Sequence, residues 1–381
     1  MATKKEVKEQ PKKKKKEDTL ENRCPSCRAS IKFNPKLGKW KCDYCGSEFT
    51  LEEMKKHSDN ASTEKKNRKD AKVEDDNIEY VSYHCESCGA EIIADSETAA
   101  TFCVYCGNTA ILQSKLSGKF APDLVIPFKN TKEDAITAFK GLSKGRPLMP
   151  KDFNNEQNIE KIRGIYIPFW LFDINNSGDI EMSATTVESW RVGDTHYTKT
   201  NYYRVVRGGT MDYNKVPIDG STRFDNAIMN TIEPFNYNEL VPYNHAYLSG
   251  FYAEKYDQSA KDVFAEAADR SINSTKEIFK NDTRYYATKT ITKDTIVAKE
   301  NTRYYAMLPV WMVNVKYKDK MHIFAMNGQT GEFIGDIPLN VGKAILYFIL
   351  IFTATFLVII IGSFILYLLG GVMIRWRKYL N

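Results

Sequence analysis

The side chains best suited to specific chemistry in this sequence are its cysteines, which come in pairs. All eight cysteines fall before residue 107 and form four Cys-x-x-Cys pairs. Two residues between cysteines let a tight turn aim both sulfurs at one metal ion, and two such pairs complete a tetrahedral site. The predicted metal ligands are Cys24, Cys27, Cys42 and Cys45 for a first site, and Cys85, Cys88, Cys103 and Cys106 for a second.

The two groups of cysteines are copies of one module. Each reads Cys-x2-Cys, fourteen intervening residues and a second Cys-x2-Cys, with a constant shift of 61 residues. A glycine follows three of the four pairs, where its conformational freedom relieves strain in the turn, but Arg28 takes that place in the first pair. We expect residues 23–51 and 83–113 to form two small four-cysteine zinc ribbons of β-structure.

The metal predicted for both modules is zinc. Four thiolates suit zinc or a rubredoxin-type iron, and ligand type alone does not separate the two metals. The short sheet-forming spacer at 31–33 and 39–41 favours a structural ribbon, so we expect two structural zinc ions, with iron and disulfides as alternatives. A module this small has too little core to stay folded without its metal.

A hydrophobic segment lies at the C-terminal end. No residue from Ala344 to Ile374 is charged, and a bilayer span needs about 20 apolar residues. We therefore expect one transmembrane helix over residues 343–374, with membrane lipid as a partner. A single-pass protein with its large N-terminal part in the cytoplasm is predicted, because paired thiols without an export signal favour a reducing compartment.

The basic residues around this segment favour a different topology. Arg375, Arg377 and Lys378 follow the segment, so the positive-inside rule places the C-terminal tail in the cytoplasm. A re-entrant helix with both ends inside is a further alternative.

Charged segments separate the other elements. Residues 1–22 contain five consecutive lysines and are predicted to be disordered, because they cannot bury enough apolar surface to offset their ordering entropy. The lysine run suits either an anionic lipid surface or plain solvation. Residues 52–82 read as a charged linker.

The remaining segment, 120–340, is predicted to be an α+β body with an antiparallel sheet. Helical periodicity at 132–142 and 257–279 does not alternate regularly with the strand-like runs. Those runs are 165–174, 202–206, 285–291, 304–317 and 321–326. The whole chain is therefore predicted to be a multidomain protein of two zinc ribbons, this body and one C-terminal transmembrane helix.

A weak repeat also lies within the body. Tyr166–Ile174 resembles Met307–Val315, with a proline and a tryptophan in register in both segments. The match indicates either a duplicated sheet unit or two similar buried strands.

Several of these motifs together resemble a known family. The Cys-x-x-Cys-Gly pairs, with the strings at 167–170 (IPFW), 308–311 (LPVW) and 324–332 (FAMNGQTGE), resemble bacterial membrane-anchored TFIIB-type zinc-ribbon proteins. The resemblance covers most of 83–340 and the anchor, but family members usually carry one ribbon. It implies a role in transcription or replication, or a scaffold beside SPFH-domain and PspA-type envelope-stress proteins.

Motifs of common enzymes are missing from the sequence. It has no phosphate-binding loop, since position 113 is glutamine where the loop needs its first glycine, and no H-E-x-x-H or G-x-S-x-G string. We therefore expect no catalytic or cofactor-binding residues apart from the zinc ligands. The predicted function is a membrane-anchored, non-enzymatic scaffold or adaptor for partner proteins, in envelope-stress handling; an enzyme housed in the body is a third hypothesis.

The second hypothesis is a membrane-tethered zinc-ribbon protein that binds nucleic acid. A net charge of +6 is too modest to identify such a protein by itself. Aromatic side chains would stack on bases and lysines would contact phosphates. The residues available for this are Trp40, Tyr44, Phe102, Tyr105, Lys36, Lys39 and Lys41.

Overall fold

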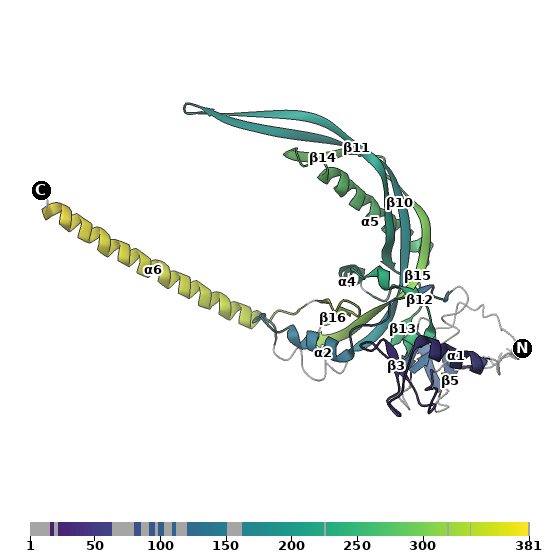
Figure 1. The fold of residues 1–381 in the computed structure, drawn as a ribbon. Coiled ribbons are helices and arrows are strands. Elements are labelled where there is room, and N and C mark those ends of the chain that lie inside the picture. Colours follow the sequence, from purple (N-terminus) through teal and green to yellow (C-terminus); the bar gives the residue numbers. More distant parts are fainter. Residues whose placement is uncertain are drawn as a thin grey trace, which may run out of the picture. The chain divides into compact units, whose positions relative to one another are not determined.

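A computed structural model describes most of the chain (Figure 1). The described residues are 16–18, 22–62, 80–84, 91–95, 98–102, 109–111, 120–150, 162–224, 226–317, 320–335 and 337–379. The chain divides into two compact units. The first comprises Met1–Ala135, Arg163–Met312 and Ala325–Ile334, and the second comprises Ile136–Ile162, Val313–Phe324 and Gly335–Asn381.

Two small three-stranded sheets lie in the N-terminal part. One has the order β2-β3-β4 and the other β1-β5-β6. Helix α1 (Leu51–Ser62) follows β4 and occupies part of the segment predicted to be a linker. The strand bounds are β1 Lys16–Asp18, β2 Lys32–Asn34, β3 Lys39–Lys41, β4 Glu48–Phe49, β5 Tyr80–His84 and β6 Glu91–Asp95.

The body is built on a sheet of eleven strands, most of them paired antiparallel. Its main order is β12-β9-β15-β10-β13-β7-β8; β11 and β14 also pair with β10, and β16 pairs with β15 and β17. The bounds are β7 Thr98–Phe102, β8 Thr109–Ile111, β9 Leu124–Val125, β10 Arg163–Val192, β11 Thr195–Asp219, β12 Val241–Pro242, β13 Tyr252–Glu254, β14 Thr288–Asp294, β15 Val297–Tyr317, β16 Lys320–Asn327 and β17 Phe333–Gly335. The prediction of a body with an antiparallel sheet is therefore confirmed.

Helices flank this sheet. They are α2 Lys132–Gly141, α4 Asn226–Thr231 and α5 Ala260–Asn281, with the 3-10 turns η3 Tyr237–Glu239 and η4 His245–Leu248. The central core lies where β10 and β15 pair and α4 packs, and includes Phe169, Leu308 and Met229. Helix α5 packs along the inner face of the long hairpin β10–β11 through Ala260, Val263 and Ala267 (Figure 1).

The two halves of the body share one local plan. Each half has a short strand, a helix and a hairpin: β9, α2 and β10–β11 in the first half, β13, α5 and β15–β16 in the second. Each short strand pairs in parallel with the hairpin of the other half, β9 with β15 and β13 with β10. The hairpins meet antiparallel, with Tyr166 opposite Pro309 and Pro168 opposite Met307.

The tryptophans of the sequence repeat make matching hydrogen bonds across the halves. Trp170 Nε1 donates to Gln258 O at 2.9 Å, and Trp311 Nε1 donates to Asn130 O at 3.0 Å. Each acceptor lies just before the helix of the opposite half. The two similar segments therefore pair directly with one another about a local two-fold axis.

Helix α6 (Val341–Tyr379) belongs to the second unit. Its residues Val341–Leu366 have a mean hydropathy of 2.9 and none of the most apolar stretch is buried. Asn340 begins the helix, since its side-chain oxygen accepts the backbone N–H of Lys343 at 3.0 Å. This one helix of the described residues is long and apolar enough to cross a membrane.

Candidate metal centre

Two tight turns bring the first four predicted ligands together. The Sγ atoms of Cys24, Cys27, Cys42 and Cys45 all lie within 4.8 Å of one another. The Cys24–Cys45 and Cys27–Cys42 sulfur separations are both 3.6 Å. Sulfurs bound tetrahedrally at about 2.3 Å from zinc lie about 3.8 Å apart, whereas a disulfide needs about 2.05 Å. The four sulfurs therefore fit one tetrahedral metal ion, and the disulfide alternative does not apply to them.

The two turns have the same backbone geometry. Arg28 N donates to Cys24 O at 2.8 Å, and Gly46 N donates to Cys42 O at 2.9 Å. Arg28 and Gly46 both have left-handed backbones, with φ of 61° and 75°. This conformation costs a residue with a Cβ about 1–2 kcal/mol, so Arg28 adopts the glycine geometry at a local energetic cost.

Proton affinities differ among the four thiols. The hydroxyl of Ser47, 3.3 Å from Cys45 Sγ, and the Ser47 backbone N–H lower the pKa of Cys45 to about 6. A backbone hydrogen bond from Ala29 lowers the pKa of Cys27, but burial and the other three sulfurs outweigh it and raise this pKa to about 12. Clustering therefore opposes four simultaneous thiolates, and a bound cation would supply the charge that stabilises them. Sequence reasoning missed Ser47, which no spacing rule would select.

The cysteine module is fixed to the body by aromatic side chains. Trp40 is buried and its Nε1 donates to Ala246 O in η4 at 2.9 Å. The Trp40 ring lies 5.0 Å from Phe33 and 5.2 Å from Tyr247, measured between centroids. Phe33 N also donates to Ser249 O at 3.1 Å. The strand pair β2–β3 thus docks on η4.

This docking changes the availability of the residues considered for nucleic-acid binding. Trp40 is enclosed, and Phe102 packs on Tyr252 with ring centroids 4.8 Å apart. Lys36 Nζ forms an ion pair with Asp134 at 3.1 Å. Exposed side chains remain at Tyr44, Lys39 and Lys41, and Tyr105 lies outside the described residues.

The cysteines of the second module also lie outside the described residues. The described strands on either side of them nevertheless repeat the pairing of the first module. In the first module, Arg23 and Ser30 form a β-bridge around the first cysteine pair. The residues 61 positions later, His84 in β5 and Glu91 in β6, lie opposite each other in the same way. Likewise Lys41 lies opposite Glu48. The corresponding partners 61 residues later are Phe102 and Thr109.

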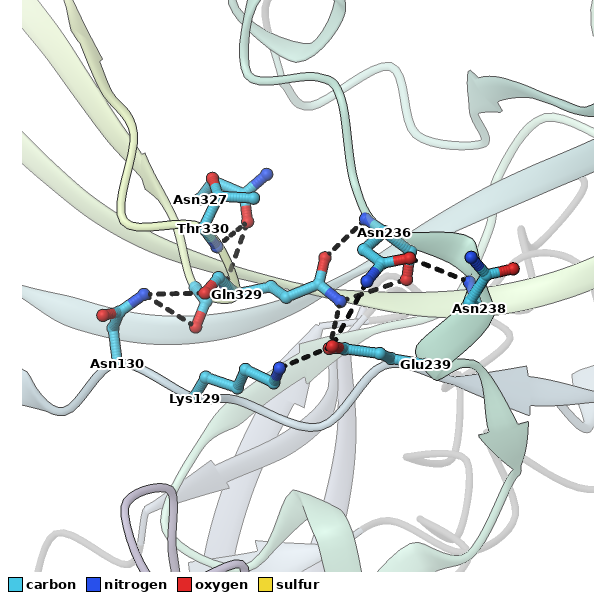
Figure 2. A network of polar contacts seen from close by, with 9 residues as sticks. Lys129, Asn130, Asn236, Asn238, Glu239, Asn327, Gln329 and Thr330 are labelled. Atoms are coloured by element: carbon cyan, nitrogen blue, oxygen red, sulfur yellow. Dashed lines mark hydrogen bonds and ion pairs between the residues drawn. The ribbon is translucent and has the colours of Figure 1, made fainter.

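The Asn-Gly-Gln-Thr-Gly string forms a separate polar network (Figure 2). Gln329 Oε1 accepts Asn236 N at 2.7 Å, and Gln329 Nε2 donates to Asn236 O at 3.1 Å and Glu239 Oε2 at 2.6 Å. Lys129 Nζ pairs with Glu239 Oε1 at 2.6 Å. Because buried amides stabilise a fold when they are fully bonded, this string fixes a loop of the body.

Comparison with known proteins places the chain in a family. No family model and no solved structure matches it. A protein of Bacillus subtilis (strain 168), "Uncharacterized protein YdjG", is 35% identical over 340 residues, which cover 76% of this chain and 99% of that relative. The match thus spans almost the whole relative and leaves part of this chain without a counterpart. This chain belongs to the YdjG family.

Proposed function

We propose that this protein is a membrane-anchored zinc-ribbon scaffold that binds partner proteins at the cytoplasmic face of a bacterial membrane. One observation carries the proposal: the four-cysteine cluster is docked on the body of a chain whose helix α6 is apolar enough to cross a bilayer. A scaffold at a membrane needs a defined binding surface and an anchor in the same chain.

Zinc is the metal that we assign to both modules. Each set of four thiolates fills the coordination sphere and leaves no open position for a substrate, so each ion would be structural. The matching strand register around the second group of cysteines supports a second ion of the same kind. The TFIIB-type ribbon resemblance agrees with this assignment.

The docked module presents a defined outer surface. Tyr44 is 84% exposed and lies in the turn between two metal ligands, Cys42 and Cys45. Exposed tyrosines are frequent anchors of protein interfaces because a large area is buried at a small entropic cost. We propose that this turn contacts the partner, and the family resemblance points to SPFH-domain or PspA-type proteins in envelope-stress handling.

The topology proposed is single-pass, with the thiolate sites in the cytoplasm, where reducing conditions preserve them. Arg375, Arg377 and Lys378 favour the opposite orientation of the tail. A cysteine-reactive reagent that cannot cross membranes, applied to intact cells after zinc removal, distinguishes the two orientations.

The decisive experiment is crosslinking in intact membranes followed by capture of the full-length protein. The wild type should retain two zinc ions and a reproducible membrane protein partner. Tyr44→Ala should lose the partner and keep both ions, while Tyr285→Ala, which changes a tyrosine that is 81% exposed outside the module, should change neither. A wild-type protein that is repeatedly captured alone, or with fewer than two zinc ions, contradicts the proposal.

Nucleic-acid binding is the competing function, favoured by the exposed Tyr44, Lys39 and Lys41 beside the metal ligands. It requires affinity for DNA or RNA that falls steeply with salt concentration. Retention on immobilised DNA or RNA at low salt, lost in a Lys39→Ala/Lys41→Ala variant, would favour this function over the scaffold.

A further inference from the structure

The outer end of the β10–β11 hairpin consists entirely of exposed residues. Residues 187–200, named the distal hairpin, pair from Val187 opposite Thr200 to Val192 opposite Thr195. A two-residue turn, Gly193 and Asp194, closes it. At about 3.3 Å per residue, Val192 lies about 26 Å along the strand from Ala184, the outermost β10 residue of the buried cluster around α5.

One face of the distal hairpin continues a buried apolar face. Side chains alternate along a strand, so the face formed by Ile180, Met182 and Ala184 continues outward to Trp190 and Val192. Thr186 and the exposed pair Glu188 and Lys199 lie on the same face between the buried part and Trp190. Nearer the base, this face is covered by Ile272 and Phe279 of α5. Helix α5 ends at Asn281, and Tyr286 beyond it still packs on Tyr203 with ring centroids 5.2 Å apart. From residue 187 outward, every residue of the hairpin is exposed as far as residue 200, and the hairpin extends past the end of α5 (Figure 1).

Two aromatic rings occupy this uncovered face. Trp190 and Tyr197 lie directly opposite each other, and their rings stack with centroids 5.7 Å apart and an interplanar angle of 11°. They are 46% and 45% exposed, and Val192 on the same face is 61% exposed. Such a set of apolar groups in water is an unfavourable arrangement that a binding partner would relieve.

The charge of the distal hairpin restricts the kind of partner. Its acidic residues are Glu188 and Asp194 and its basic residues are Arg191 and Lys199, so they balance. Arg191 is also paired with Asp194 at 3.1 Å. A neutral surface suits neither a polyanion nor a strongly charged protein patch.

Aromatic side chains with one polar atom each have a preferred environment. Tryptophan and tyrosine concentrate where bilayers meet water, because their rings enter the acyl boundary while their N–H and O–H groups remain hydrated. Four other side chains of the distal hairpin carry hydroxyl groups, which also suit this layer: Ser189, Thr195, Thr198 and Thr200. The outer edges of a two-stranded hairpin carry unpaired backbone groups that need water, so deeper insertion is excluded.

We propose that the distal hairpin is a second membrane-contact site, which places Trp190, Tyr197 and Val192 in the interfacial layer of the bilayer. Arg191 and His196 lie on the opposite face and remain in water. The proposal rests on the membrane anchoring part of the proposed function, but it requires neither the zinc ions nor a protein partner.

The test uses the full-length protein in liposomes made with ordinary or brominated lipids. The difference between wild-type and Trp190→Phe fluorescence isolates the emission of Trp190. We expect this emission to be blue-shifted, to be lost with lipids brominated near the headgroup, and to resist aqueous iodide. The matched control is the difference given by Trp170→Phe, which should be insensitive to the brominated lipids because Trp170 is in the sheet.

Two other results would overturn the proposal. Trp190 emission quenched by iodide and not by bromine places the distal hairpin in water. Emission protected from both quenchers places it against protein, including a second copy of this chain. Failure of this test leaves the Tyr44 crosslinking result unchanged, so the two proposals fail separately.

Discussion

The hairpins β10–β11 and β15–β16 occupy equivalent places in the two halves of the body, yet they differ greatly in length. Strands β10 and β11 have 30 and 25 residues, whereas β16 has 8. Both hairpins nevertheless close on the same contact: Gly220 N donates to Pro168 O at 2.8 Å, and Gly328 N donates to Pro309 O at 2.9 Å. The part of each hairpin near this contact is common to both halves and forms the shared sheet. The extra length of β10–β11 has no counterpart in β15–β16.

The residue preceding each of these glycines also plays the same role. Asp219 Oδ1 accepts Ser221 N at 3.1 Å, and Asn327 Oδ1 accepts Gln329 N at 2.9 Å. The two side chains differ in charge, since Asp219 has a carboxyl group where Asn327 has an amide. The neutral amide of Asn327 also donates to a backbone carbonyl, Ile232 O, at 3.0 Å, whereas a buried carboxylate has nothing to donate.

The largest difference in stability is expected between the alanine variants of Gly328 and Gly220, the glycines that end the two hairpins. A Cβ on Gly328 would lie 2.6 Å from the Phe128 ring, which is buried and stacked on Phe251 at 4.1 Å. Around Gly220 the nearest atom would be 3.1 Å away, on Tyr256. Overpacking of this kind costs about 1–3 kcal/mol, so Gly328→Ala should cost about 3 kcal/mol and Gly220→Ala about 1 kcal/mol.

Thermal and urea unfolding of the detergent-solubilised protein would measure both variants. Each variant controls for the other, because the same group is added at equivalent positions. Equal losses of stability would contradict the packing difference between the halves.

Part of the similarity between the two halves of the body could be predicted from the sequence. The Pro and Trp repeat is visible, because both strands are buried on both faces and read as apolar runs. The match of Asp219-Gly-Ser-Thr222 to Asn327-Gly-Gln-Thr330 was overlooked, since two turn residues and one threonine are common in any loop. The long hairpin was predicted only as fragments, 165–174 and 202–206, because polar residues from Asn175 onward interrupt the alternation.

In the cysteine module, too, local features could be predicted from the sequence and contacts between distant residues could not. The gathering of Cys24, Cys27, Cys42 and Cys45 followed from their spacing, because two residues between cysteines fix the geometry locally. The docking of Trp40 did not follow, since its hydrogen-bond acceptor is a backbone carbonyl 206 positions away. Every residue has a backbone carbonyl, so no sequence pattern identifies the one that accepts this hydrogen bond.

A second prediction concerns the charge difference at the ends of the hairpins. Burial raises the pKa of Asp219 from 3.8 to about 6, and three nearby carboxylates add to the effect; they belong to Glu266, Asp257 and Glu233. Because the folded-state pKa is raised, the protonated carboxyl stabilises the fold below about pH 4. That contribution is lost as the pH rises to about 6.

A rise of the pKa from 3.8 to about 6 corresponds to about 3 kcal/mol at 1.36 kcal/mol per pKa unit, and partial screening by water reduces this energy. Asp219→Asn should therefore stabilise the protein at pH 7 by about 2 kcal/mol. The new amide keeps an oxygen that can accept Ser221 N, and it removes the charge that the nearby carboxylates repel. The advantage over wild type should shrink as the pH falls toward 4. Unfolding midpoints compared at pH 4 and pH 7 check this, and a difference that does not depend on pH would show that Asp219 is not the titrating group.

The smallest effect on stability is expected from removing the distal hairpin. Thr186 and Asn201 lie directly opposite each other, so an Asn-Gly turn can replace residues 187–200 without changing the register. All fourteen residues removed are exposed, and changes at exposed positions usually alter stability by less than about 0.5 kcal/mol.

The shortened protein should unfold at the wild-type midpoint and keep its bound metal. In the same liposomes, the Trp190 part of the emission that brominated lipids remove from the wild type should be absent. A midpoint lowered as far as that of Gly328→Ala would mean that the distal hairpin belongs to the folded core of the first half. Unchanged stability together with lost lipid contact would instead mean that the distal hairpin serves membrane binding and not folding. The two halves would then share one sheet unit, to which the first half alone adds a membrane-binding extension.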